Sequence, residues 1–415
     1  MSLPEFRKIV PPPGKSGIAG PDAKSHTEVR IKNPRAQELI GTWRALYEKP
    51  FSGITSDGKV VPGLFSLAPN GAPIKPIVAA ATNLLSRLTS AQRAAVCFPL
   101  DAPEWRRWQN TELQLEADGI RLDQVDASIR DTIMAVVQES LSPQGFEKIR
   151  NVMKLNRFLG DLVDGPGVMG EWSFTFSLFA KPSLTEPWGW QLFGHHLALN
   201  CLVIGEQMVI SPTFLGAEPF YADAGPFKGI RLFREEEELG LALMRSLSPA
   251  QQAQATIFHS MKGGDIPPER VHFADERHFG GAFRDNRIVP YEGIKISEFS
   301  RDQKKCLLDL IEVFLILLPP GPRKARIEDI VAHLDETRFC WIGGHGESST
   351  FYYRVQSPVV LIEFDHHCGV FLTNENPEKF HVHTIVRTPN GNDYGNALLD
   401  LYYARSSKDR SRPKE

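Results

Sequence analysis

The chain of 415 residues is long enough for one large domain or two ordinary ones, with a sizeable core in either case. Its 42% hydrophobic and 23% charged residues are typical of a globular protein, and the net charge of −3 indicates neither nucleic acid nor an anionic membrane surface as a partner. The five cysteines are scattered without a Cys-x-x-Cys pair. This argues against a disulfide framework and a zinc ribbon, and it favours a reducing compartment.

The two ends of the chain have the composition of unfolded segments. Residues 1–34 carry Pro11-Pro12-Pro13 and alternating charges without apolar periodicity, so we expect a disordered N-terminal arm. Residues 406–415 are charged and predict a frayed tail. The first residues contain no apolar signal core, and no later run reaches the roughly 18 apolar residues of a membrane span. A cytoplasmic location without membrane contact is therefore the default expectation.

Helix signals dominate the first half of the chain, where a helical part is expected over residues 76–163. A hydroxyl residue stands three positions before a glutamine in three stretches, Thr89–Gln92, Ser248–Gln251 and Ser300–Gln303. This spacing is typical of a capping box, which satisfies two backbone donors at the start of a helix. The helices that follow do not resemble one another in sequence, so we expect no internal repeat.

Strand signals are concentrated in two separated regions, residues 171–215 and 338–387. Helical patterns lie between them, over residues 235–259 and 301–318. Runs of strands and runs of helices without strict alternation predict an α+β fold, with antiparallel sheet packed against helices. We expect a single large domain over residues 35–405.

The first β region contains the most unusual stretch of the chain, Trp188–Asn200, which predicts a long aromatic strand with His195 and His196 in its middle. Both faces of this strand are largely apolar, so we expect it in the centre of the sheet, covered on each side. At least one of the two histidines must then be buried and hydrogen-bonded. Gly216, which follows in the next strand, predicts an unusual backbone angle or a close approach of other atoms.

The second β region carries a His-x-His pair, because His381 and His383 share one face of a strand. Residues two apart on a strand are separated by about 6.7 Å, and two imidazoles at that spacing can converge on one ion. Glu363 lies near the end of an apolar strand, where a lone carboxylate is costly unless it is paired or bound to a metal. Together with a histidine of the tandem, these residues predict a metal site with two or three histidines and a carboxylate.

Other interpretations of the same residues stay open. The His-x-His pair can be an ordinary polar face, and Glu363 can form a buried ion pair with Arg354 or Arg387. The adjacent pair His366-His367 is interpreted as solvated loop histidines. Asp393 either belongs to a plain turn or orients a ligating imidazole, as carboxylates commonly do.

These motifs resemble the family catalogued as domain of unknown function 3500. The resemblance is carried by Trp188–Asn200, Pro212–Pro219, Tyr353–Pro358, Ile362–Asp365, His381–Arg387 and Asn392–Gly395, and the upstream stretches Phe51–Gly58 and Glu104–Trp108 are similar too. It extends over residues 36–403 and implies one full-length unit. The resemblance implies no particular activity.

The sequence contains no Gly-x-Ser-x-Gly elbow, His-Glu-x-x-His helix, Walker loop or dinucleotide fingerprint. Our leading hypothesis is a metal-dependent enzyme that acts on a small organic molecule, with hydrolysis slightly favoured over oxygen chemistry. The expected ligands of a zinc or iron ion are His196, Glu363, His381 and His383. The candidate catalytic residues are His195, Asn200, Arg387 and Asp393. The alternatives are a metal-free enzyme that uses His and Glu as acid and base, and a small-molecule binding protein without turnover. The oligomeric state is left open.

Overall fold

The computed structural model describes residues 5–116, 118–272 and 274–410. Within these ranges the strands form one twelve-stranded sheet. The strands are β1 (Cys97–Phe98), β2 (Ile120–Arg121), β3 (Phe174–Phe179), β4 (Trp188–Gly194), β5 (Leu197–Ile204), β6 (Gln207–Ala217), β7 (Thr256–Phe258), β8 (Ile294–Lys295), β9 (Arg338–Gly343), β10 (Phe351–Gln356), β11 (Leu361–His366) and β12 (Val382–Arg387). Their order is β1-β3-β4-β5-β6-β12-β11-β10-β9-β7, with β2 paired to β3 and β8 paired to β9.

Eleven α-helices accompany this sheet in the described ranges. They are α1 (Ala23–Arg30), α2 (Pro34–Tyr47), α3 (Ile74–Arg87), α4 (Ser90–Val96), α5 (Ala127–Ser140), α6 (Pro143–Leu162), α7 (Arg234–Ser246), α8 (Pro249–Ala255), α9 (Arg301–Phe314), α10 (Pro320–Ala332) and α11 (Asn396–Arg410). The predicted α+β class is confirmed. The two β regions join into one sheet, however, and the sheet is mixed, because β1 is parallel to β3 and β7 is parallel to β9. In both places a pair of helices separates the two parallel strands, which is the connection that parallel pairing requires.

The two halves of the sheet are built by the same series of elements. In each half, two helices lead into a short edge strand, a second short strand, two further helices and an antiparallel meander of four strands. The first series is α3, α4, β1, β2, α5, α6 and β3 to β6, and the second is α7, α8, β7, β8, α9, α10 and β9 to β12. The halves meet where β6 pairs antiparallel with β12. The expectation that the chain has no internal repeat is therefore wrong.

The repeat is visible in the residues that shape the backbone. The capping boxes at Thr89 and Ser248 begin the equivalent helices α4 and α8. Gly119 and Gly293, with φ of 85° and 77°, precede the equivalent strands β2 and β8. Most other side chains differ between the halves, which is why a comparison of helix sequences does not detect the repeat.

The strand register repeats as well. Gln191, the fourth residue of β4, lies opposite Asn200 on β5, and Arg354, the fourth residue of β10, lies opposite Glu363 on β11. At equivalent backbone positions, a glutamine thus faces an asparagine in one half and an arginine faces a glutamate in the other. The halves share a frame but differ in chemistry.

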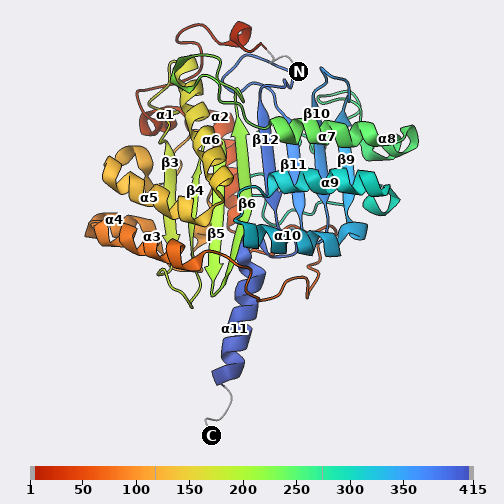
Figure 1. The fold of residues 1–415 in the computed structure, drawn as a ribbon. Helices are drawn as coiled ribbons and strands as arrows, with labels where there is room; N and C mark the ends of the chain where they lie inside the picture. The colour runs from red at the N-terminus through yellow and green to blue at the C-terminus, as the bar shows by residue number, and fades with distance from the viewer. Residues whose placement is uncertain (1–4, 117, 273, 411–415) are drawn as a thin grey trace.

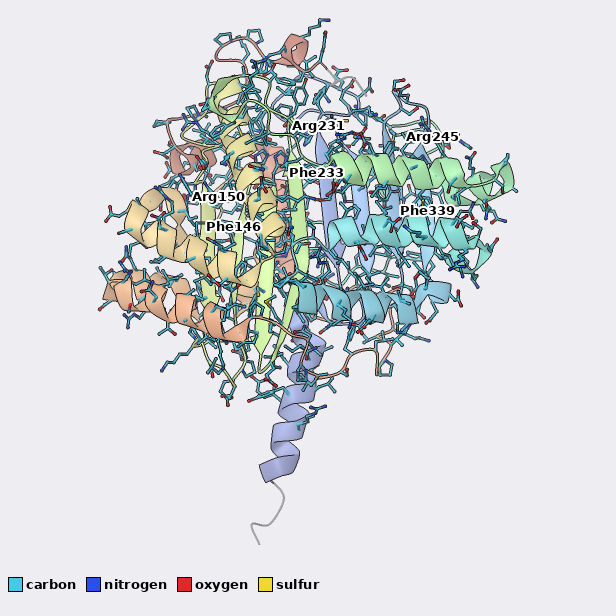
Figure 2. All side chains as sticks on the ribbon, in the orientation of Figure 1. Phe146, Arg150, Arg231, Phe233, Arg245 and Phe339 are labelled. Carbon is cyan, nitrogen blue, oxygen red and sulfur yellow. The ribbon has the colours of Figure 1, made fainter. Side chains whose placement is uncertain are left out.

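The long helices of both halves cover one face of the sheet (Figure 1). Helices α3, α5 and α6 lie over the first meander, and α7, α9 and α10 lie over the second. Figure 2 shows side chains filling the space around these helices, with Phe146 and Arg150 on α6 and Arg245 in the last turn of α7. The main hydrophobic core lies in this layer, where sheet residues such as Trp190, Leu199 and Phe364 are buried.

The opposite face of the sheet is covered differently, by α2 and by irregular chain between β1 and β2 and between β7 and β8. A second hydrophobic cluster fills this layer, with Trp43 of α2 and Phe279 and Phe283 of the second irregular segment among its members. Ile385 of β12 belongs to this cluster, while its neighbour Val386 belongs to the main core. Because strand residues alternate between faces, His383 and Arg387 of β12 lie on the loop-covered face with Ile385.

The ends of the chain extend beyond this frame in different ways. Residues 5–34 contain α1 and do not match the predicted disordered arm: Phe6 is fully buried, and His26 is buried beside Glu112 at 3.0 Å. The segment is ordered by a few inserted side chains that composition does not reveal. Helix α11 projects away from the body (Figure 1), and residues 411–415 of the predicted frayed tail lie outside the described residues. In the part of the chain that the structure describes, no helix has the length and apolar character needed to cross a membrane.

Candidate metal centre

Three histidines from distant parts of the sequence meet on the loop-covered face, beside the pairing of β6 with β12. The ligand atoms of His196, His381 and His383 all lie within 4.8 Å of one another, and all three side chains are buried. The Nε2 atoms of His381 and His383 are 3.1 Å apart. The structure thus brings together three of the four residues that the sequence suggests as metal ligands.

The close approach of these rings depends on Gly216, which lies opposite His383 in the β6–β12 pair. A Cβ atom at this position would be 2.8 Å from Cδ2 of both His196 and His383, well inside van der Waals contact. The predicted close approach at Gly216 is confirmed. Only glycine leaves room for both imidazoles over the strand.

The tandem histidines form a two-residue loop between β4 and β5, and not the middle of one long strand as predicted. Gly194 pairs with Leu197 across this loop, and His196 has a φ of 64°, in the left-handed region that non-glycine residues rarely adopt. The Asn110 side-chain oxygen accepts a hydrogen bond from the His196 N–H at 2.9 Å. The turn was missed because no glycine or asparagine stands in the loop, as it commonly does in tight hairpins.

His381 is oriented by a neighbouring backbone group. Its Nδ1 lies 2.6 Å from the carbonyl oxygen of Cys368. Because a carbonyl can only accept, Nδ1 must carry the proton, and Nε2 presents its lone pair toward His383. Such a contact at the far nitrogen is the usual way in which proteins orient a metal-binding imidazole.

The three imidazoles are held in the neutral state that metal binding requires. Burial lowers the pKa of His196, His381 and His383 well below the usual value, because an environment of low polarity disfavours the charged ring. The neighbouring imidazoles lower each pKa further. Protons therefore compete little with a cation for these nitrogens.

Two more histidines extend the cluster. The ligand atoms of His278 and His367 lie within 4.8 Å of each other and of His383. His367 also forms a group of this kind with Glu276 and Asp365. His278 and Glu276 come from the irregular segment between β7 and β8, whereas Asp365 and His367 lie at the end of β11. The interpretation of His366-His367 as solvated loop residues is wrong, because both are buried.

Glu363, the predicted fourth ligand, has other partners. Its carboxylate accepts hydrogen bonds from the backbone N–H groups of Phe279 and Gly280 at 2.8 and 2.7 Å, and from the Tyr352 hydroxyl at 2.7 Å. Burial raises its pKa, but His278, Arg354 and the Phe279 amide outweigh burial and lower the pKa to about 2. Glu363 thus fixes the irregular segment between β7 and β8, called the covering segment below, to the sheet. Glu363 itself lies outside the three groups of converging ligand atoms.

The alternative of an ion pair between Glu363 and an arginine does not describe the contacts either. Arg354 donates to Glu292 at 2.7 Å, and Arg387 donates to Asp285 and Asp393 at 2.8 Å each. The nearest charged partner of Glu363 is His278, at 3.6 Å.

His195 and Asn200 flank the centre. The Nδ1 atom of His195 lies 2.8 Å from the side-chain oxygen of Asn156 on α6, and its ring stacks on His196 with centroids 3.8 Å apart. Burial lowers the pKa of His195 to about 4. Asn200 accepts from Gln191 at 2.6 Å and donates to the Pro212 carbonyl at 2.9 Å. The contacts of both residues are directed to the frame around the histidines.

Arg387 and Asp393 form a separate buried network. The guanidinium of Arg387 also donates to the backbone carbonyls of Gly280 and Gly281, and so joins β12 to the covering segment. Asp393 accepts from the Ser211 hydroxyl at 2.7 Å and from the Thr388 N–H at 2.8 Å. No contact to a histidine of the centre is among the described hydrogen bonds and ion pairs of these two residues.

Sequence reasoning missed four members of the cluster. Alternation along β11 could have revealed two of them, because Asp365 and His367 share with Glu363 the face on which His383 of the next strand lies. His278 and Glu276 gave no usable signal, since they lie in a loop-rich stretch without periodicity.

The fold and the centre together define an α+β protein with an internally repeated frame and a buried histidine–carboxylate cluster on one face of its sheet. The chain belongs to the family described as protein of unknown function (DUF3500), which matches residues 70–396. Neither a curated protein nor a solved structure shows a significant match to the chain. The matched range includes every histidine of the cluster.

Proposed function

We propose that the protein is a metal-dependent enzyme that acts on a small organic molecule, with hydrolysis as its favoured reaction. The observation that carries this proposal is the convergence of His196, His381 and His383, with two Nε2 atoms 3.1 Å apart. Two nitrogens bound to one zinc ion at about 2.0–2.1 Å each have a separation of this size. Three protein ligands leave the fourth position of a tetrahedral ion open, which is typical of catalytic zinc.

His196, His381 and His383 would hold the ion, which would lower the pKa of a bound water to about 7 and so supply hydroxide at neutral pH. The protein contributes the orientation of the ligands, through the Cys368 carbonyl and Gly216, and the exclusion of bulk water. The three histidines are buried, and Phe279 and Phe283 of the segment between β7 and β8 belong to the hydrophobic cluster on the same face of the sheet.

Room for a small molecule exists beside the centre. A cavity of about 280 Å³ on the loop-covered face extends between α2 and the first meander as far as Gly194, the residue before the tandem histidines. Trp43, Phe193 and Phe283 supply apolar walls, and Arg107 and Glu112 supply charge. A mixed lining of this kind suits a small organic molecule with polar groups.

Elemental analysis of the purified protein tests this proposal. We expect at least one equivalent of zinc or iron in the wild type, and loss of that equivalent in His383→Ala. His345→Ala, in an exposed loop, is the matched control and should keep the metal. A panel of chromogenic esters, assayed with metal-loaded and chelator-treated protein, then tests hydrolysis. A wild type that binds neither metal, even after incubation with either ion, would contradict the proposal and favour a metal-free enzyme or a binding protein.

A further inference from the structure

The histidine cluster is larger than one tetrahedral ion requires. His383 belongs to two overlapping groups, one with His196 and His381 and one with His278 and His367. The rings of His367 and His383 have centroids 3.9 Å apart, and those of His278 and His367 are 5.6 Å apart. Five buried imidazoles in contact therefore outnumber the four ligand positions of a zinc ion.

The additional histidines lack hydrogen-bond partners. Both ring nitrogens of His278 and the Nε2 atom of His367 are buried and make no hydrogen bond to any described residue. The nearest acceptors to His278 are Glu363 at 3.6 Å and Asp365 at 3.9 Å, both beyond hydrogen-bonding distance. An unpartnered buried polar atom costs about 1–3 kcal/mol. Nε2 of His278 and Nε2 of His367 both lie near Asp365, whereas Nδ1 of His278 lies near Glu363, so two unpartnered nitrogens from different strands and loops face the same carboxylate.

A carboxylate oxygen completes this second set. Oδ2 of Asp365 lies 3.2 Å from Nε2 of His367 and 3.9 Å from Nε2 of His278. Atoms that coordinate one ion at about 2.0–2.2 Å lie at most about 4.4 Å apart, so both of these distances are short enough for atoms that share one ion. Asp365 also lies directly opposite His383 on the β11–β12 pair, beside the first ligand set.

The charges around this second set favour a cation. Three buried or nearly buried carboxylates surround it, from Glu276, Asp365 and Glu363. In the described residues, Arg277 is the guanidinium that pairs with Glu276 and Asp365, and no guanidinium pairs with Glu363. Three carboxylates around one guanidinium give this part of the protein a negative potential, which attracts a cation.

We propose that the centre holds two divalent metal ions, the first on His196, His381 and His383 and the second on His278, His367 and Asp365. The inference rests on the proposed function, because both ions share the cluster around His383. It also specifies that function: in a two-ion site, one ion activates water while the other holds the substrate oxygen that gains negative charge.

The test is the zinc content of full-length protein that has been stripped with a chelator and dialysed against zinc. We expect two equivalents in the wild type and in His345→Ala. His278→Gln and Asp365→Asn, which preserve side-chain volume, should retain about one equivalent. Anomalous scattering from zinc-loaded crystals should show two peaks separated by about 3.5–4 Å.

The outcomes separate the inference from the proposal on which it rests. One equivalent in the wild type overturns the second ion and leaves the first site standing. No zinc in the wild type overturns both. Two equivalents that persist in a folded His278→Gln, with unchanged melting temperature, would place the second ion elsewhere and also overturn the inference. If His278→Gln does not fold, the anomalous peaks of the wild type decide.

Discussion

Gly216 on β6 and His383 on β12 face each other across the junction of the two half-sheets, and the imidazole of His383 occupies the space that a side chain at Gly216 would need. The ring of His196 approaches the same position from the β4–β5 loop. The absence of a side chain at Gly216 thus allows His196 of the first half to approach His383 of the second half.

Gly216→Ala should therefore damage the centre more than the fold. The new methyl group lies 2.8 Å from both rings and must displace them, so we expect metal affinity to fall at least about tenfold. Overpacking should lower the free energy of unfolding by about 1–3 kcal/mol. Isothermal titration with zinc and denaturant unfolding measure the two effects. Gly41→Ala, where no atom lies within 4 Å of the new Cβ, is the control. Unchanged zinc affinity in Gly216→Ala would contradict the assignment of His196 and His383 as ligands.

Asp393→Asn should lower stability and leave the metal content unchanged. Asp285 and Asp393 both pair with the buried guanidinium of Arg387. Asparagine at position 393 would remove one negative charge from this pair, and its NH₂ group cannot accept a hydrogen bond from Arg387. We expect the free energy of unfolding to fall by about 3 kcal/mol. Asp309→Asn removes an exposed pair with Lys305 and should cost less than about 1 kcal/mol. If Asp393→Asn instead abolished activity without loss of stability, the sequence-based expectation of a catalytic Asp393 would be favoured.

The internal repeat predicts matched effects at Gly119 and Gly293. Both have positive φ, and a Cβ atom would lie 2.6 Å from the Phe176 carbonyl oxygen or 2.1 Å from that of Phe339. Alanine at either position should therefore lower the free energy of unfolding by about 2 kcal/mol or more. Gly205→Ala also has positive φ but meets no atom within 4 Å, so it should cost only about 1 kcal/mol. Clearly unequal losses at Gly119 and Gly293 would argue against equivalent roles in the two halves.

The contact between His26 and Glu112 should make the docking of α1 sensitive to acid. His26 accepts from the Ala19 N–H at Nδ1, so its Nε2 carries the proton and donates to Glu112. Burial raises the pKa of Glu112, but the bond from His26 together with the charges of His195 and His26 outweighs burial, so the pKa lies below the usual value of 4.5. A carboxylate whose pKa is lower in the folded state stabilises the fold above pH 4.5, and this stabilisation is lost as the pH falls toward the folded-state pKa.

Glu112→Gln should accordingly lower the free energy of unfolding by about 2 kcal/mol at pH 7. The difference from the wild type should shrink as the pH falls below 4.5. Denaturant unfolding at pH 7 and pH 3.5 measures this, with Glu28→Gln on the exposed face of α1 as the control. A difference between Glu112→Gln and the wild type that is independent of pH would contradict the assigned role of the carboxylate.

Much of the local structure could be predicted from the sequence because its signals are local. The capping boxes at Thr89, Ser248 and Ser300 each begin a helix in the structure. Strand alternation correctly placed His383 and Arg387 on one face of β12. The convergence of the two β regions followed from the need to satisfy buried histidines, and the structure does bring His196 to His381 and His383.

The remaining features depend on contacts that are distant in sequence. The hairpin at His195-His196 is held by Asn110 and by the Gly216 N–H, and neither contact can be recognised from the tandem itself. Glu363 binds backbone N–H groups of the covering segment, which carry no sequence signature. His278 reaches the cluster through the same segment. The repeat was not detected from the sequence because only a few helix caps and glycines are shared by equivalent positions of the two halves.

The pairing of β6 with β12 has a consequence for how the protein unfolds. His196 belongs to the first half-sheet, whereas His381 and His383 belong to the second. A cation coordinated by all three would therefore crosslink the halves at the β6–β12 junction, in addition to contacts such as the Lys148–Glu236 ion pair and the bond from the Ser142 N–H to the Leu317 carbonyl. Ligand binding to the native state alone adds free energy to unfolding in proportion to the logarithm of ligand concentration. That added free energy would be lost by separation of the halves as well as by unfolding of either, so metal binding at this centre would couple the unfolding of the two repeats.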